Sequence, residues 1–203
     1  MDSAEMMKLL ETRRTYRRFD ETRPVPDEAV RDMKAALRLS SCSSNRQLLR
    51  FVFVRDPEKV KAVFACTRWA AMLPEGRGTP GEGQRPVMFA ALLFEEGKLP
   101  RWMLDTDAGI ALSNLTLAAW THGIGSCMLG NIDREGISRI LKVPEGMTLH
   151  TVTAFGYPAH ACHIVPPGPD GSLKYYMDEQ GDFYVPKREE DEFIFAEEYG
   201  AHR

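Results

Sequence analysis

The stretch AGIALSNLTLAAW, residues 108–120, is apolar almost throughout; its only polar side chains are those of Ser113, Asn114 and Thr116. As a helix, it would have no wide face suited to water. Such a helix must be covered on every side, either by a large core or by a partner subunit. Gly123 is expected to end it. A helix buried in this way is therefore the first element of the predicted fold.

Several strands are predicted on either side of this helix. PVMFAALLF (86–94) is apolar on both faces, which is typical of a buried central strand. FVFV (51–54) and MTLHTVTAFGY (147–157) have strand length and composition. KYYMDEQGDFYVPKR (174–188) indicates a hairpin that turns at Gln180-Gly181.

Four more helices are indicated by caps and by apolar residues at helical spacing. The first is capped by Ser3, the second follows Pro26, the third begins at Asp56-Pro57, and the fourth runs from a cap at Asp133 to Leu141. Residues 72–85 are rich in glycine and proline and are expected to form a mobile loop. Helices and strands are mixed without regular alternation, which favours an α+β fold.

Length, charge and composition exclude several classes of protein. The chain has 203 residues, a length that fits one domain, and a net charge of -3 argues against nucleic acid or an anionic membrane as its main partner. There is no apolar run long enough to span a bilayer, and the N-terminal residues lack the apolar core of a signal peptide. The four cysteines are scattered, as expected for reduced thiols in a cytoplasmic protein.

The densest candidate site is the run Arg13-Arg14-Thr15-Tyr16-Arg17-Arg18. Four guanidinium groups within six residues repel one another unless solvent or an anion offsets their charge. Arginine forks and a threonine hydroxyl match the oxygens of a phosphate. The cluster alone leaves two interpretations open, a bound phosphate and a solvated basic edge.

Five segments, in this order and at compatible spacing, resemble the nitroreductase superfamily. They are RRTYRRF (13–19), SSCSSNRQ (40–47), DAGIALSNLTLAAWTHGIGSCMLGNID (107–133), VPEGMTLHTVTAFGYP (143–158) and VPKR (185–188). Two departures concern the wall of the expected pocket. Leu48-Leu49 follows Gln47 where the family often has Pro-Trp, and Ser41 stands where a proline is common.

The resemblance implies a nitroreductase-like fold, in which helices flank a central, mostly antiparallel sheet and two chains intertwine as a homodimer with shared active sites. It implies one FMN-binding domain over residues 1–203, with 186–203 as a C-terminal segment. The implied enzyme takes hydride from NAD(P)H and reduces a flat organic acceptor, such as a nitroaromatic or a quinone, by a ping-pong mechanism. The alternative is a non-catalytic FMN-binding or sensing protein of the same fold. A structural dimer that binds an anion without flavin is a third hypothesis.

The resemblance also assigns residues to the flavin, while the flavin itself performs the transfer and no catalytic side chain is expected. Arg17 would lie near the pyrimidine edge of the ring, and the Gly130 N–H would reach flavin N5. The residues expected at the phosphate and ribityl chain are Arg13, Arg14, Thr15, Lys187 and Arg188. Those expected in a loop at the partner's flavin are Ser41, Cys42, Ser43 and Asn45, and those in a turn along the isoalloxazine are Met128, Leu129 and Gly130.

For several other residues, both a functional and a structural role are considered. Trp102 could stack on an acceptor or be a core or interface tryptophan. Gln84 or Arg85 could read the N3/O4 edge of the flavin. The sequence His160-Ala161-Cys162-His163 could ligate a metal, but no second ligand cluster accompanies it, so no metal is expected. Cys127 is expected to be a small buried residue.

Overall fold

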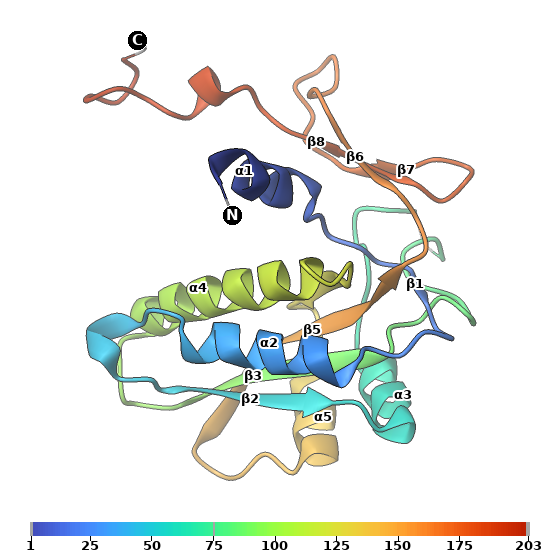
Figure 1. Cartoon of the computed structure of the whole chain (residues 1–203), viewed down its shortest axis with the longest axis vertical. Coiled ribbons are helices and arrows are strands. Elements are labelled where there is room, and N and C mark those ends of the chain that lie inside the picture. The colour runs from blue at the N-terminus through green and yellow to red at the C-terminus, as the bar shows by residue number, and fades with distance from the viewer. Residues whose placement is uncertain (1, 75, 202–203) are drawn as a thin grey trace. The chain divides into compact units, whose positions relative to one another are not determined.

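The computed structural model describes residues 2–74 and 76–201, and Figure 1 shows the elements of the chain. The helices are α1 (Ser3–Thr12), α2 (Asp27–Arg38), α3 (Pro57–Ala65), α4 (Arg101–Trp120) and α5 (Arg134–Leu141), with short 3-10 turns η1 (Ser43–Asn45) and η2 (Glu190–Glu192). The strands are β1 (Phe19–Asp20), β2 (Leu49–Val54), β3 (Met88–Glu95), β4 (Gly125–Leu129), β5 (Met147–Pro158), β6 (Cys162–Val165), β7 (Tyr176–Met177) and β8 (Phe183–Pro186).

The chain forms two compact units. The first comprises the chain up to Trp69 together with Thr79–Ala159, and the second comprises Ala70–Gly78 together with the chain from His160 onward. The larger unit holds α1–α5 and β1–β5, while the smaller unit holds β6–β8. That one domain spans residues 1–203 stays a prediction.

The sheet of the larger unit is antiparallel throughout. Its order is β1-β5-β3-β2, and β4 also pairs with β5. The first seven residues of β3 are buried, as predicted for a central strand, because β2 and β5 pair with its two edges and helices cover its faces. Met88, Ala90 and Leu92 belong to one core cluster with residues of α2 and α4 (Figure 1). The α+β class and the antiparallel sheet are confirmed.

The long apolar helix is confirmed, but it begins earlier than predicted. α4 begins at Arg101 after Pro100, so it takes in the segment before Ala108 as well. Leu104, Ala108 and Leu115 are buried in the core of the unit. Trp102 and Ile110 stay exposed by 69% and 37%. Within one chain, α4 is therefore covered on only part of its circumference.

Two local predictions were wrong at helix α1 and strand β4. The cap of α1 is Asp2, whose carboxylate accepts the Glu5 N–H while the Glu5 carboxylate accepts the Asp2 N–H, so Ser3 is the first helical residue instead. Met128 and Leu129 lie in β4 instead of a turn, because the backbone there pairs with β5. Strands β1 and β6 were not predicted.

A pair of glycines fixes how the chain passes over the sheet. Gly125 of β4 and Gly156 of β5 are directly paired. A Cβ at Gly125 would lie 2.8 Å from Tyr16 Cδ2, and one at Gly156 would lie 2.8 Å from Phe19 Cβ. Because glycine has no Cβ, the segment 16–19 can lie directly on this strand pair. The arginine run at residues 13–18 overlaps this segment and is thereby held next to β4.

The smaller unit contains the predicted hairpin. β7 pairs with β8 in antiparallel register, and Gly181 in the turn has a φ of +94°. β6 adds to β8 in parallel, which places His163 beside Tyr184 with ring centroids 4.8 Å apart.

Among residues 72–85, those that the structure describes form turns and bends without a helix or strand, as predicted; their mobility stays a prediction. No helix in the described part of the chain is long and apolar enough to cross a membrane.

Candidate active site

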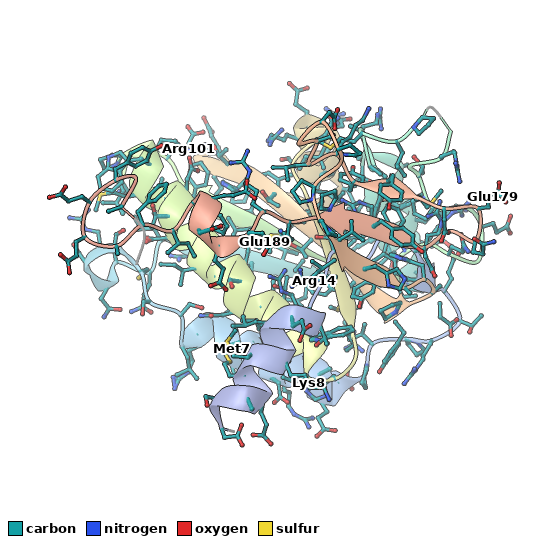
Figure 2. All side chains as sticks on the ribbon, turned by 90° about the horizontal axis from the view of Figure 1, so that it is seen from above. Met7, Lys8, Arg14, Arg101, Glu179 and Glu189 are labelled. Carbon is teal, nitrogen blue, oxygen red and sulfur yellow. The ribbon has the colours of Figure 1, made fainter. Side chains whose placement is uncertain are left out.

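The arginine run begins where the chain leaves α1 and is held between α4 and β4. The Tyr16 ring stacks on Trp120, the last residue of α4, with centroids 5.2 Å apart. Trp120 Nε1–H in turn donates to Thr12 Oγ1 at 2.9 Å. Thr15 forms a parallel bridge with Ser126, and the Tyr16 N–H donates to the Ser126 carbonyl at 2.9 Å. Figure 2 shows Arg14 just beyond α1.

Two guanidinium groups of this run are half-buried, and some of their N–H donors lack hydrogen-bond acceptors. Arg13 and Arg14 are half-buried, and the buried Nε of each has no hydrogen-bond partner in the described part of the chain. An Arg14 terminal nitrogen donates to the Leu10 carbonyl. Burial lowers the pKa of Arg13, and the charge of Arg14 lowers it further. Buried cations with unused donors are costly unless an anion neutralises them, so this arrangement fits a phosphate.

Arg17 lies close to β4, where the predicted isoalloxazine contacts are. Burial raises the pKa of the Cys127 thiol to about 11, and the positive charge of Arg17 partly offsets that rise. Cys127 is 3% exposed, so the prediction of a small buried residue is confirmed. Met128 is 43% exposed, and a Cβ on the exposed Gly130 would meet no atom within 4 Å. Leu129 is buried, so the accessible surface at this end of β4 consists of Met128 and Gly130.

The loop that was assigned to the partner's flavin lies elsewhere along α4. Ser41 and Asn45 are exposed, while Cys42 and Ser43 are half-buried. The Ser43 N–H and hydroxyl both donate to Asp107 Oδ1 at 2.8 Å. Asp107 is thirteen residues before Trp120 on α4, a distance of about 20 Å at 1.5 Å per residue. One chain therefore does not bring this loop and the arginine run together.

The remaining candidates lie in three places. Lys187 and Arg188 are exposed and follow β8 in the smaller unit. Trp102 is exposed on the first turn of α4, so the alternative of a core tryptophan is wrong for this chain. Gln84 accepts the Phe19 N–H through its carbonyl. Arg85 lines a separate hollow of about 420 Å³, where its guanidinium lies 5.5 Å from the Phe64 ring.

Two residues that hold the loop were not predicted from the sequence. Asp107 is 2% exposed and supports Ser43, while Asn114 Nδ2–H donates to Ser40 Oγ at 2.9 Å. The signal was present in the sequence, because Asp107 is an acidic residue directly before the apolar run 108–120. An acidic side chain on such a helix needs a polar partner if it is buried.

Fold and site together define a class of protein, an α+β chain with a cluster of half-buried arginines beside a central antiparallel sheet. The model of the nitroreductase family matches residues 10–157. The chain belongs to the nitroreductase family. The matched range contains the arginine run, the loop at residues 41–45 and β4, and it ends before Lys187 and Arg188.

Similar proteins match this chain over most of their length. A protein of Archaeoglobus fulgidus, named as an NADH dehydrogenase/NAD(P)H nitroreductase, is 29% identical over 76% of this chain and 86% of its own. A nitroreductase solved in complex with FMN, from Desulfovibrio desulfuricans, is 25% identical with a TM-score of 0.59, over 75% of this chain and 86% of that one. An FMN-dependent nitroreductase from Clostridium difficile is 24% identical with a TM-score of 0.61, over 76% and 88%.

Proposed function

We propose that this protein is an FMN-dependent oxidoreductase that takes hydride from NAD(P)H and reduces a flat organic acceptor, such as a nitroaromatic or a quinone, in a ping-pong sequence. The names of its relatives support the NAD(P)H donor and the nitroreductase type of reaction. The FMN complex of the Desulfovibrio desulfuricans protein supports the cofactor. When bound, FMN supplies the acceptance of hydride and its delivery to the acceptor.

The buried, unpartnered Nε atoms of Arg13 and Arg14 are the observation that carries the proposal. A terminal phosphate would accept from these donors and neutralise two cations that burial disfavours. The Thr15 hydroxyl, on the same segment, would add a donor to the phosphate and ribityl end. Lys187 and Arg188 would complete the phosphate contacts. None of these groups has to exchange a proton during turnover, so their role is to bind and orient.

The ring end of the cofactor would lie along β4. Arg17 would place a positive charge near the pyrimidine edge, where reduction concentrates negative charge. Met128 would contact the ring, with buried Leu129 supporting it from within the sheet. Gly130 would bring its backbone N–H to flavin N5, because the open space at its Cα lets the ring approach closely. Trp102 lies still further along α4 from the arginine run than Asp107 does, so it would stack on the acceptor in the partner subunit's site.

The active protein would be a homodimer with two shared sites. The loop residues Ser41, Cys42, Ser43 and Asn45 are attached about 20 Å along α4 from the arginine run of the same chain. They would therefore complete the site of the partner subunit. Exposed Trp102 and Ile110 on α4, and Met7 on α1, supply apolar surface for such an interface.

Purification and turnover assays test this proposal directly. We expect a yellow protein with one FMN per subunit after reconstitution and no FAD in the acid extract. NADH and NADPH oxidation is then measured with and without a panel of nitroaromatic and quinone acceptors. Acceptor-dependent turnover supports an enzyme, whereas bound FMN without turnover supports a sensing protein. A protein that retains no FMN would overturn the proposal.

A further inference from the structure

Asp107 carries a carboxylate into the buried face of α4. Among the buried polar residues that the structure describes, it is the only one with an acidic side chain, and the others are threonines and a serine. Its Oδ1 accepts two hydrogen bonds from Ser43, one from the backbone N–H and one from the hydroxyl, both at 2.8 Å. A buried carboxylate is tolerated when such donors satisfy it.

The second contact comes seven residues further along the same helix. Asn114 Nδ2–H donates to Ser40 Oγ at 2.9 Å. Residues seven apart lie on one face of a helix, two turns from each other. Asp107 and Asn114 therefore hold the two ends of the segment 40–43, and α4 carries both contacts.

The loop beyond this segment needs such support. Ser44, Asn45 and Gln47 have φ angles of 50°, 53° and 52°, in the left-handed region that costs energy for residues other than glycine. Inside the loop, the Gln47 N–H donates to Cys42 Sγ and Gln47 Nε2–H donates to Asn45 Oδ1. These internal contacts shape the loop, and Arg46 Nη1–H donates to the Lys98 carbonyl at 3.0 Å. The α4 contacts at Ser43 and Ser40 tie the loop to the buried side of the helix.

We infer that Asp107 and Asn114 are positioning residues that act in trans: they fix the loop of one subunit so that it completes the FMN site of the other. This inference rests on the proposed function, because it requires FMN bound between two chains. Neither residue touches the cofactor. α4 would thus link the dimer interface to the geometry of the flavin site.

A mixed-dimer experiment tests this inference. Two differently tagged chains, one with Arg13→Ala and one with Asp107→Leu, are co-expressed, and the mixed dimer is isolated on both tags. FMN affinity is measured by flavin fluorescence. We expect each homodimer to bind FMN about tenfold or more weakly. Arg13→Ala loses a charge-assisted hydrogen bond to the phosphate, and Asp107→Leu loses the two hydrogen bonds that hold Ser43 in place.

The mixed dimer separates action in trans from action in cis. If Asp107 acts in trans, one site of the mixed dimer carries both the Arg13→Ala and the Asp107→Leu defect, and the other site carries neither. We expect half of the sites to regain wild-type FMN affinity. If Asp107 acts on its own chain, each site carries one defect and no site regains wild-type affinity, which overturns the inference. A merely structural defect of the Asp107→Leu chain would give the same negative result.

Two controls and one substitute variant keep the outcomes distinct. Asp107→Asn keeps an acceptor for Ser43, so its loss of affinity is expected to be clearly smaller than that of Asp107→Leu. Asp105→Asn removes an exposed carboxylate of the same helix and is expected to leave FMN affinity unchanged. If Asp107→Leu does not fold, Asn114→Ala replaces it in the same mixed dimer. A wild-type protein that binds no FMN refutes the proposed function instead, before any variant is compared.

Discussion

Thr15 and Ser126 form a parallel bridge that ties the arginine run to β4. The bridge joins the two parts of the candidate site that one chain does bring together, the guanidinium groups of Arg13 and Arg14 and the accessible end of β4. Tyr16 strengthens the connection through its N–H to the Ser126 carbonyl. Its ring lies against Gly125, where no side chain fits. Packing at this crossing therefore decides where the phosphate and the ring of the cofactor would lie.

The two glycines at the ends of β4 should respond differently to an added methyl group. Gly125→Ala forces a Cβ within 2.9 Å of Tyr16 and is expected to lower the free energy of unfolding by about 1–3 kcal/mol. Gly130→Ala meets no atom within 4 Å and should change stability by less than about 0.5 kcal/mol. It should nevertheless weaken FMN binding. Thermal unfolding of the apoproteins and FMN titration check both expectations, and equal stabilities would contradict the packing argument.

Arg13→Ala, Arg14→Ala and Lys187→Ala should each weaken FMN retention while the fold stays intact. Losing one charge-assisted contact to the phosphate is expected to cost on the order of 1.5–3 kcal/mol of binding. Arg31→Ala, which removes an exposed arginine of α2, is the control and should bind FMN as the wild type does. Equilibrium dialysis gives the affinities. Unchanged affinity in Lys187→Ala alone would show that Lys187 does not contact the phosphate.

Arg17→Ala should act on the potential of the flavin more than on its retention. Removing a positive charge near the pyrimidine edge is expected to lower the reduction potential by some tens of millivolts. Potentiometric titration of the reconstituted protein measures this shift, with Arg31→Ala again as the control. A potential identical to that of the wild type would show that Arg17 does not lie near that edge.

A charge on the exposed face of α4 should separate the subunits. Leu115 is fully buried within one chain, so Leu115→Glu would break the core and cannot test the interface. Ile110→Glu is the sharper variant, because Ile110 is 37% exposed. We expect it to give a folded monomer that has lost FMN, seen by light scattering and flavin absorbance. Arg139→Glu, at an exposed position of α5, is the control. An Ile110→Glu monomer that retains FMN would refute the shared site.

Cys127 should be the slowest of the thiols to react in the folded protein. With a pKa of about 11 it is about 0.1% thiolate at pH 8, and its side chain is 3% exposed. We expect alkylation followed by mass spectrometry to modify Cys42, in the loop at residues 41–45, well before Cys127. After denaturation the two should react alike. Rapid modification of Cys127 in the native state would argue that β4 opens.

Elements whose physical signal is local could be predicted before the fold was known. Apolar runs predicted β3 and the part of α4 from Ala108 to Trp120, and the caps Asp56 and Asp133 marked the starts of α3 and α5. Caps and periodicity act within a few residues, so they can be recognised without the fold. That the arginine run binds an anion stays a prediction, which rests on its charge density and on the family resemblance.

Other features of the fold and the site depend on contacts between residues distant in sequence, and these could be recognised only in the structure. β4 became a strand because β5 supplies its partner, and Gly125 matters because Tyr16 crosses above it. Asp107 has a role because a loop 64 residues away in sequence brings two donors to its carboxylate. Such pairings arise from packing across the whole unit, and no window of the sequence contains both partners.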